Sequence, residues 1–527
     1  MRHIKNKQFS SPIMSTALSI FICLLLTLGG FLLSSCGGKT GNESSQGVKS
    51  ETPVFSAAES GEPTSSSPII EDDFGDRDII FLTIGGANQV SEVIFNETLS
   101  EGEQSWMTVA VNEAIRERNN RAESYLNCHI KELAITSDRV GREMLSYVRN
   151  ELAGGQHTFD ICAPSIYDCG TLAAEGSFLN LIEIPSLNTQ NPWWDQSFNS
   201  SMTINGCLYF TLGDIGLFNK NATPVVYFNK NLAGDHGLEP SVLYGLVRDN
   251  KWTFDKAYEY AKLLSVDVDD NAVIDFNDKV GWAGQADDTW NFFFASGERI
   301  VTQSGEKTLE LTMFGGRSVN VAEKMYTMFR DTDHYISANN YFNVSGTPTY
   351  ECTGKAFLEG RVMFFSDNMA FMHFFAGMDD EFGVLPTPKF DDAQDDYFSL
   401  INPWTGNAFA LPAVLSEEDA YYAGGLLDVM GYYSVETVAY EYVQRTLKYQ
   451  KTRDDDSVDM IQLIFDTRGC DIGIIYNIGL SSGTSLPTML QNLMNSPGST
   501  FTAAYEAIAT AAQLDLDEVI DLYTKNG

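Results

Sequence analysis

The sequence has few basic residues and lacks the short motifs that mark common metal, phosphate and dinucleotide sites. Lysine and arginine number 34 in 527 residues, against 71 aspartate and glutamate residues. A surface this acidic repels phosphate backbones and anionic lipids, which argues against nucleic-acid binding. No HExxH motif, P-loop or GxGxxG fingerprint occurs in the chain. These absences disfavour zinc peptidases, nucleotide-dependent enzymes and nucleic-acid-binding proteins as function classes.

Cysteine is scarce, and its placement does not suggest a metal site. Two of the eight cysteines, Cys23 and Cys36, lie close to the amino terminus. No two cysteines form a CxxC pair, and the histidines share no metal-like spacing, so a zinc site has no support. An exported chain can form disulfides, but buried free thiols explain scattered positions equally well. The other six cysteines are Cys128, Cys162, Cys169, Cys207, Cys352 and Cys470.

One match to a catalytic motif occurs, at Gly479-Leu480-Ser481-Ser482-Gly483, which fits GxSxG. In α/β-hydrolases the catalytic histidine follows the nucleophilic serine in the chain, whereas the last histidine here is His373, a hundred residues earlier. We interpret the match as chance. Acidic pairs suited to glycoside hydrolysis are expected at random in a chain with 71 acidic residues, so their presence decides nothing.

The longest uncharged run lies at the amino terminus. Three basic residues precede residues 8–33, which carry no charged side chain. The run ends at Leu33-Ser34-Ser35-Cys36, which resembles the lipobox of bacterial lipoproteins, with Cys36 as the lipidation site. The pattern predicts a lipoprotein signal peptide over residues 1–35 and a body held at the extracellular face of the membrane. An uncleaved membrane anchor is the alternative, because the run is almost long enough to span a bilayer.

Residues 36–77 differ in composition from the rest of the chain. They are rich in glycine, serine, threonine, proline and glutamate and contain few large apolar side chains. Such a segment cannot bury enough surface to fold, so we expect a flexible tether.

Strand-like and helix-like patterns alternate after the tether. This β-α-β-α-β order predicts a parallel sheet covered by helices. Ligands of such sheets bind beyond the carboxyl ends of the strands, so Ser165 and Tyr167, which follow the third strand, are candidate ligand contacts. The expected elements are a strand at 78–84, a helix at 105–118, a strand at 130–135, a helix at 137–152 and a strand at 159–163.

Two tryptophan-rich segments are candidate ligand contacts. Trp193 and Trp194 could stack on a ligand, but we favour packing of their loop onto the body. Trp282, Asp287 and Trp290 lie within a polar, glycine-bearing loop. An indole face suits the C–H surface of a sugar, and a carboxylate bonds its hydroxyls, but core packing of the two tryptophans is equally open.

An acidic stretch approximates the calcium loop of an EF-hand. Carboxylates or an amide occupy loop positions 1, 3, 5, 9 and 12. The glycine expected at position 6 is Ala272, and position 12 is aspartate, whose shorter side chain reaches less far than glutamate. The stretch predicts a structural calcium site, with a solvated acidic loop as the alternative. The candidate ligands are Asp267, Asp269, Asn271, Asp275 and Asp278.

Four segments, in this order along the chain, carry a family resemblance: Thr223–Leu232, Ala356–Asn368, Phe382–Asp391 and Asn402–Pro412. They resemble segments of family 1 extracellular solute-binding proteins of ABC transporters, which include maltose-binding protein. The resemblance rests on short motifs spread over about residues 78–527. It implies an α/β, two-lobed, type II periplasmic-binding-protein fold, in which each lobe is a mostly parallel sheet flanked by helices and hinge crossings join the lobes.

The resemblance also implies a division of the chain. Lobe 1 would comprise residues 78–222 plus 405–450, and lobe 2 residues 228–402 plus 451–527. Thr223–Leu232 would carry the first crossing and Asn402–Pro412 the second.

The function implied is that of a monomeric, lipid-tethered receptor without catalytic activity. It would bind a small solute, most simply a sugar or oligosaccharide, between the lobes and deliver it to an ABC permease after hinge closure. Trp282, Trp290 and Trp404 would be stacking platforms, and Asp287 and Asn368 would bond hydroxyls. The alternatives are a surface glycoside hydrolase, a non-transport carbohydrate sensor or adhesin, and a receptor for a peptide or another solute.

Overall fold

The computed structural model describes most of the body and none of the amino-terminal segment. The predicted signal peptide, Cys36 and most of the predicted tether lie outside the described residues, and residues 61–527 form a compact unit. Within the described part, no helix is long and apolar enough to cross a membrane. The described residues are 69–85, 91–97, 99, 107–136, 142–304, 308–341, 349–451 and 454–525.

The first lobe is built on a parallel sheet of order β2–β1–β3. The β1–β2 register runs from Arg77–Cys128 to Gly85–Thr136, and β3 adds a short pairing on the other side of β1. The predicted β-α-β-α-β order is confirmed, although only two residues of the third segment form strand pairs. The elements are β1 (Arg77–Gly85), α1 (Val109–Leu126), β2 (Cys128–Thr136), α2 (Glu143–Ala153), β3 (Ile161–Cys162) and α3 (Ile166–Ala174).

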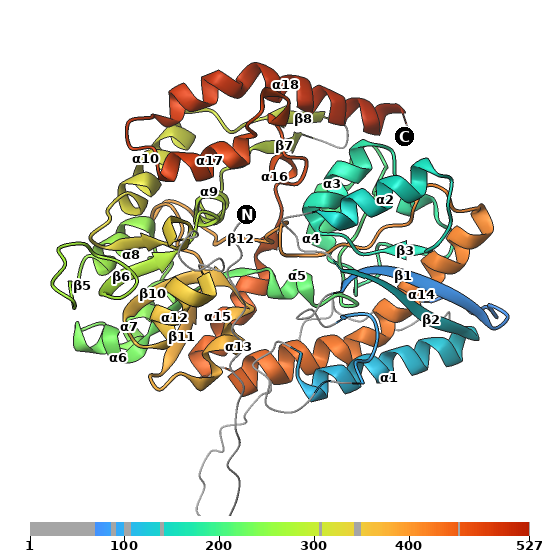
Figure 1. Ribbon diagram of the computed structural model, residues 1–527, viewed down its shortest axis with the longest axis horizontal. Helices are drawn as coiled ribbons and strands as arrows, with labels where there is room; N and C mark the ends of the chain where they lie inside the picture. The colour runs from blue at the N-terminus through green and yellow to red at the C-terminus, as the bar shows by residue number, and fades with distance from the viewer. Residues whose placement is uncertain are drawn as a thin grey trace, which may run out of the picture. The chain divides into compact units, whose positions relative to one another are not determined.

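The end of the predicted tether belongs to the first lobe. The backbone N–H of Phe74 donates to Leu126 O at 2.7 Å, and the Phe74 side chain is 2% exposed, edge-on to Tyr422. Ile69 is also buried. Residues 69–76 are therefore packed, because this otherwise polar stretch has three large apolar side chains, Ile69, Ile70 and Phe74, which lie against α1 and α14 (Glu417–Glu436). Helix α14 lies along α1 on the same side of the sheet (Figure 1).

The second lobe contains a mixed sheet of order β11–β4–β10–β6–β5, with β9 paired to the end of β6. Strands β6, β9 and β10 run parallel to one another, whereas β4 is antiparallel to both β10 and β11. All six residues of β4 are buried. The strands are β4 (Pro224–Asn229), β5 (Ser265–Val266), β6 (Lys279–Gly284), β9 (Tyr335–Ser337), β10 (Val362–Asn368) and β11 (Phe382–Leu385).

Helices and a hairpin surround this second sheet. Helix α8 starts at an N-cap, where the Thr253 hydroxyl accepts from the backbone N–H of Lys256. The helices are α6 (Lys230–Asp235), α7 (Pro240–Arg248), α8 (Phe254–Ala261), α9 (Asp288–Ala295), α10 (Gly316–Phe329), α12 (Gly354–Leu358) and α13 (Phe371–Phe374), with the hairpin β7 (Val301–Ser304) and β8 (Thr308–Leu311). Further short helices of the chain are Leu181–Glu183 (η1), Gln196–Met202 (α4), Phe218–Asn221 (α5), Ala338–Tyr341 (η2), Thr349–Thr353 (η3), Phe375–Gly377 (η4) and Leu480–Ser482 (η6).

Three chain segments run side by side between the two sheets. The first links α5 to β4, and the second leaves β12 (Ser399–Leu400) and pairs Ala410 with Cys162. The third is β13 (Arg468–Gly469), which pairs in parallel with β12. Arg468 ties the third segment to the first lobe through an ion pair with Asp195 at 2.5 Å. The resemblance predicted the first two crossings but not the third.

The carboxyl-terminal segment, residues 417–525, contacts both lobes. Helix α15 packs on β11 and α17 on α9, whereas α16 packs on α3 and α18 reaches α17, β8 and α3 (Figure 1). Residues beyond 471 therefore bridge the two lobes instead of belonging to lobe 2 alone. The elements are α14 (Glu417–Glu436), η5 (Tyr440–Lys451), α15 (Asp455–Asp466), α16 (Ile472–Ile475), α17 (Leu486–Met494) and α18 (Phe501–Lys525).

The six cysteines of the body are all buried free thiols. Cys162 Sγ, for example, lies 3.6 Å from the carbonyl oxygen of Ala410. Burial raises the pKa of the Cys128 thiol to about 12. The sequence left both disulfides and buried free thiols open, and the structure supports buried free thiols.

Candidate ligand-binding site

The second crossing collects most of the predicted ligand contacts. Ser165 caps α3 at the end of β3: its hydroxyl accepts from the backbone N–H of Asp168 at 3.1 Å. The Ser165 backbone forms a bridge with Asn407 of the crossing. The position at a strand's carboxyl end agrees with the prediction, but the hydroxyl is already engaged as a helix cap.

Tyr167 and Trp404 form an aromatic pair that is half-buried. Their ring centroids are 5.6 Å apart in an edge-to-face arrangement. The guanidinium of Arg142 lies 5.1 Å from the Tyr167 ring centroid and donates from Nε to Asp168 Oδ1 at 2.7 Å. Burial raises the pKa of Tyr167 to about 12. The pair therefore offers partly exposed aromatic surface beside a cation. Arg142, which follows the second strand, is a residue that the sequence reasoning missed.

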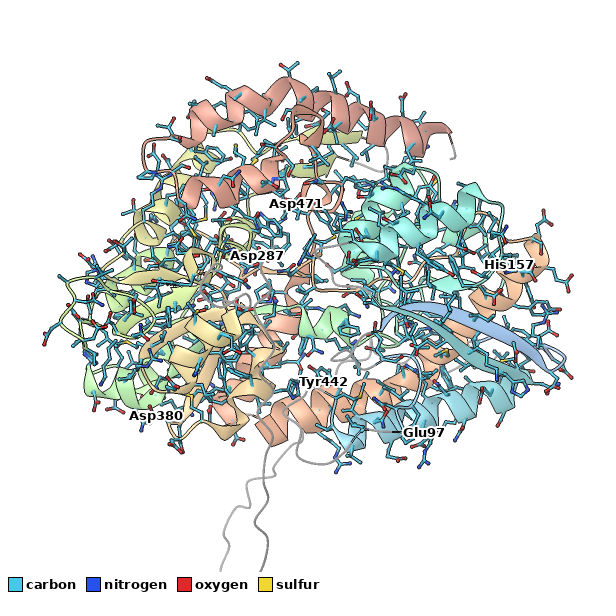
Figure 2. The ribbon with its side chains drawn as sticks, viewed as in Figure 1. Glu97, His157, Asp287, Asp380, Tyr442 and Asp471 are labelled. Carbon is cyan, nitrogen blue, oxygen red and sulfur yellow. The ribbon has the colours of Figure 1, made fainter. Side chains whose placement is uncertain are left out.

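Asp287 and Asn368 approach the same crossing from the second lobe. Asp287, labelled in Figure 2, precedes α9 and accepts from Asn402 Nδ2 at 2.8 Å and Gln491 Nε2 at 2.7 Å. Burial raises its pKa. Asn368 ends β10, and its Nδ2 lies 3.5 Å from Thr405 Oγ1. Ser165, Tyr167, Asp287, Asn368 and Trp404 thus all contact or belong to residues 402–407.

The other two predicted platforms lie inside the second lobe. Trp282 is 0% exposed and is stacked against Trp252 and Phe364, and its Nε1 donates to Ser366 Oγ at 3.0 Å. Trp290 is buried as well, and its Nε1 donates to the carbonyl of Pro487 at 2.8 Å. For both tryptophans the sequence left ligand stacking and core packing open. The structure shows core packing, with no open ring face on either side chain.

Trp193 and Trp194 pack onto the first lobe, as favoured from the sequence. Both indole N–H groups donate to one oxygen of Asp428 on α14, at 2.8 and 2.9 Å. The side-chain amide of Asn191 donates to the other oxygen at 3.0 Å. The buried carboxylate thereby holds the loop on the helix.

Two buried acids at the end of the second sheet were also missed. Asp288 Oδ2 accepts from the hydroxyls of Ser366 and Tyr335. Burial raises the pKa of Asp288 to about 7 and that of Asp367 well above its usual range. Each is the chain neighbour of a residue chosen from the sequence, Asp287 or Asn368. Asp288 begins α9 and Asp367 lies on β10, and the packing of these two elements, which the sequence does not reveal, sets how deeply each acid is buried.

The predicted calcium loop brings together three of its five candidate ligands. Carboxylate oxygens of Asp267, Asp269 and Asp278 lie within 4.8 Å of one another. Ala272 adopts φ 63°, the left-handed conformation that position 6 of such a loop requires and usually assigns to glycine. All five candidates also accept from backbone N–H groups of the loop, as Asp267 Oδ2 does from Ala272 N and Asn271 Oδ1 from Val273 N. Oxygen ligands of this kind suit Ca²⁺.

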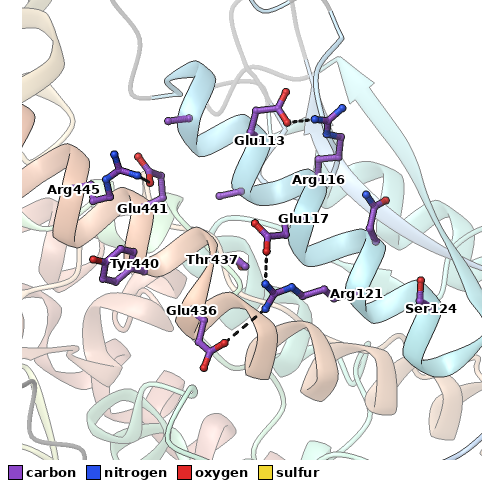
Figure 3. A pocket seen from close by; sticks show the side chains of 13 residues that line it. Glu113, Arg116, Glu117, Arg121, Ser124, Glu436, Thr437, Tyr440, Glu441 and Arg445 are labelled. Carbon is purple, nitrogen blue, oxygen red and sulfur yellow. Dashed lines mark hydrogen bonds and ion pairs between the residues drawn. The ribbon is translucent and has the colours of Figure 1, made fainter.

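A groove lined by charged side chains lies away from this site. It measures about 800 Å³ and runs between α1 and the junction of α14 with η5 (Figure 3). Its charged side chains are paired within the groove: Glu113 with Arg116, Glu117 and Glu436 with Arg121, and Glu441 with Arg445. None of the predicted ligand contacts lines it.

No protein-family model and no curated protein sequence matches the chain. Solved structures do match. A cyclic α-maltosyl-1,6-maltose binding protein of Arthrobacter globiformis has a TM-score of 0.55 at 10% identity, covering 86% of this chain and 100% of that one. An ABC substrate-binding protein of Listeria monocytogenes in complex with cycloalternan has a TM-score of 0.51 at 12% identity, covering 84% and 99%. UgpB of Mycobacterium tuberculosis, in complex with glycerophosphocholine, has a TM-score of 0.52 at 18% identity, covering 77% and 95%.

The chain has the fold of an ABC-transporter solute-binding protein. The predicted type II periplasmic-binding-protein fold is thereby confirmed, and these structural neighbours are binding proteins. At such low identities the likeness extends to the fold and not to the ligand. In this solute-binding fold, residues 402–407 lie in one of the segments that connect the lobes, which is where the candidate contacts gather.

Proposed function

We propose that the protein is a membrane-tethered, extracellular receptor that binds a sugar or oligosaccharide and delivers it to an ABC permease. The observation that carries the proposal is the gathering of five candidate contacts around residues 402–407. Tyr167 and Trp404 supply aromatic surface for sugar C–H groups, and Asp287 and Asn368 supply acceptors and donors for hydroxyls. Two of the structural neighbours support a carbohydrate ligand: the one in complex with cycloalternan and the cyclic α-maltosyl-1,6-maltose binding protein.

The mechanism proposed is hinge closure. The contacts come from both lobes and from the segment that joins them, so a solute held by all of them favours the closed arrangement. Closure is driven only by the difference in affinity between the open and closed states. Such a receptor binds its solute and releases it unchanged.

Tethering follows from the amino-terminal sequence. Lipidation of Cys36 would anchor the chain, since each buried methylene contributes about 0.8 kcal/mol of membrane affinity. Residues 36–68 would then connect the anchor to the body, which packs from Ile69 onward. The permease partner is proposed because the chain shares its fold with an ABC substrate-binding protein.

We also propose a structural Ca²⁺ ion in the loop of Asp267, Asp269 and Asp278. The positive φ of Ala272 and the approach of three carboxylates support it. The ion would hold the loop that connects β5 to β6.

A thermal-shift screen of the purified protein against neutral mono- and oligosaccharides, followed by product analysis, tests the function. A ligand at a hundred times its Kd adds about 2.7 kcal/mol to the free energy of unfolding. We expect a clear shift with the sugar recovered intact. Recovery of cleaved sugar would replace the receptor with a glycoside hydrolase, and no shift with any sugar would overturn the carbohydrate assignment.

A further inference from the structure

Residues 471–525, which we call the strap, are fixed to the second lobe through α17. Three side chains of that lobe donate hydrogen bonds to backbone carbonyls that are spaced three residues apart along α17. Helix α18 then packs on α17, α10 and β8. We therefore expect the strap to move with the second lobe as one body. The bonds are Trp290 Nε1 to Pro487 O at 2.8 Å, Tyr326 Oη to Leu490 O at 2.7 Å and Arg330 Nε to Leu493 O at 3.1 Å.

The strap touches the first lobe at its start. Helix α16 lies so close to α3 that a Cβ at Gly170 would fall 2.4 Å from the carbonyl oxygen of Ile475. Glycine, which has no Cβ, permits this approach. Because α16 directly follows β13, this contact lies beside the connections between the lobes, where a hinge movement displaces the chain least.

The far end of α18 makes a second contact with the first lobe. Asn205 Nδ2 donates to the backbone carbonyl of Tyr523 at 2.8 Å, and the buried Tyr523 ring lies 5.2 Å from the ring of Tyr209. The hairpin beside α18 reaches the same loop of the first lobe, because Gln303 Nε2 on β7 donates to the carbonyl of Thr203 at 3.0 Å. Residues 203–205 of the first lobe are therefore bonded both by the strap and by the second lobe.

Helix α18 joins the two anchored ends of the strap as one continuous rod. It has 25 residues, a length of about 37 Å, and runs across the molecule from the side of α10 to the side of α3 (Figure 1). Since a helix does not stretch, the lobes can separate on this side only if one end of the strap lets go. In the described residues the strap has fewer hydrogen bonds to the first lobe than to the second, so the contact at residues 203–205 is the one that breaks.

The strap also borders the candidate ligand-binding site. Gln491 of α17 donates to Asp287 at 2.7 Å. Gly170, which α16 touches, lies one helical turn beyond Tyr167 on α3. Separation of the lobes at the site therefore pulls on the strap.

We propose that the hydrogen bonds of residues 203–205 with Gln303 and Tyr523 form a latch that limits how far the lobes open. The inference rests on hinge closure in the proposed function and adds the device that restrains it. With the latch made, the lobes stay near the arrangement that holds a solute. Breaking the latch raises the share of open protein, and the apparent affinity falls with the share of protein that is competent to bind.

Small-angle X-ray scattering of the purified protein without solute tests the latch in Asn205→Asp, Gln303→Ala and the double variant. Aspartate keeps the shape of Asn205 and tolerates its φ of 51°, but it replaces the N–H donor by an oxygen that repels the Tyr523 carbonyl. Each lost hydrogen bond shifts the ratio of open to latched protein roughly threefold to tenfold. We expect a larger radius of gyration in each variant and the largest in the double variant.

Asn150→Asp is the matched control, because Asn150 is an exposed residue of α2 in the same lobe and the substitution changes the charge equally. It leaves the radius of gyration unchanged, and an equal expansion in this control overturns the latch. Variants that match the wild type also overturn the latch, and contraction of the wild type on binding a sugar then leaves hinge closure standing. No change of radius in any sample, with sugar or without, overturns both.

Discussion

Asn402 donates its side-chain amide to Asp287 Oδ2 at 2.8 Å, joining the second crossing to the start of α9. The other oxygen of Asp287 accepts from Gln491 on α17 at 2.7 Å. Three segments that are far apart in the sequence therefore meet at one carboxylate. A movement of the lobes about the crossing has to carry these bonds along or break them.

Replacement of Asp287 by alanine leaves two amides without their acceptor. Hydrogen bonds to a charged group contribute about 1.5–3 kcal/mol when buried, and Asp287 is half-buried. We expect Asp287→Ala to lower the free energy of unfolding by about 1–3 kcal/mol, measured by urea titration. Gln491→Ala removes only one of the bonds and has a smaller effect. If the urea midpoint is unchanged in both variants, Asp287 does not join the second crossing to α9 and α17.

Asp428 is expected to be among the most sensitive positions of the first lobe. Asp428→Ala leaves the indole N–H groups of Trp193 and Trp194 buried without an acceptor. We predict a loss of about 3 kcal/mol or more in the free energy of unfolding. Glu418→Ala on the same helix removes an exposed ion pair with Arg77 and costs less than about 1 kcal/mol. Equal effects of the two variants would show that the tryptophan–carboxylate contact does not hold the loop.

Asp288 makes stability depend on pH. Burial raises its pKa from 3.8 to about 7 in the folded protein. Below about pH 4 both states hold the proton, and between about pH 4 and pH 7 only the folded state does. The folded state therefore loses stability as the pH rises through this window, and the loss is complete above it.

The measurement is the free energy of unfolding of the wild type and of Asp288→Asn across that window. Because asparagine does not titrate, the stability of the variant relative to the wild type should rise by an amount on the order of 1–4 kcal/mol from pH 4 to pH 7. A difference that stays constant with pH means that Asp288 is ionised in the folded protein throughout.

Calcium should stabilise the β5–β6 loop. We expect excess Ca²⁺ to raise the melting temperature relative to a chelator, with about 2.7 kcal/mol gained at a hundred times the Kd. Asp269→Asn weakens this response because it removes a charged ligand. Asp270→Asn is the control in the same loop: Asp270 has φ 57° and occupies no ligand position, and asparagine accepts that conformation. Melting temperatures that do not respond to Ca²⁺ favour the solvated acidic loop.

Local patterns were sufficient to predict the order of elements in the first lobe and the polar loops after its strands. Runs of apolar residues mark β1 and the strand before Ser165, and the alternation with helical spacing indicates parallel strands. The motif resemblance added the two-lobed arrangement and the crossing at residues 402–407. These features depend on residues that are close together in the chain.

Features set by tertiary packing were not predictable. Trp282 and Trp404 are chemically alike, but Trp282 is buried against Trp252 and Phe364 across the sheet, whereas Trp404 is half-buried and meets the edge of Tyr167. The same limit applies to Asp288, which the packing of α9 on the sheet places over Gly284. The third segment was missed because β13 is two residues long and becomes a connection only through its pairing with β12.

The central claim is tested most directly by calorimetric titration of an oligosaccharide into the wild type, Trp404→Ala and Trp282→Ala. The account predicts that the wild type binds intact sugar. It also predicts that Trp404→Ala lowers the affinity by about tenfold or more, with little loss of stability. Trp282→Ala instead lowers the free energy of unfolding by about 3–5 kcal/mol, because it empties a core position. Undiminished affinity in Trp404→Ala, or no sugar binding by the wild type, would contradict a carbohydrate site at the second crossing.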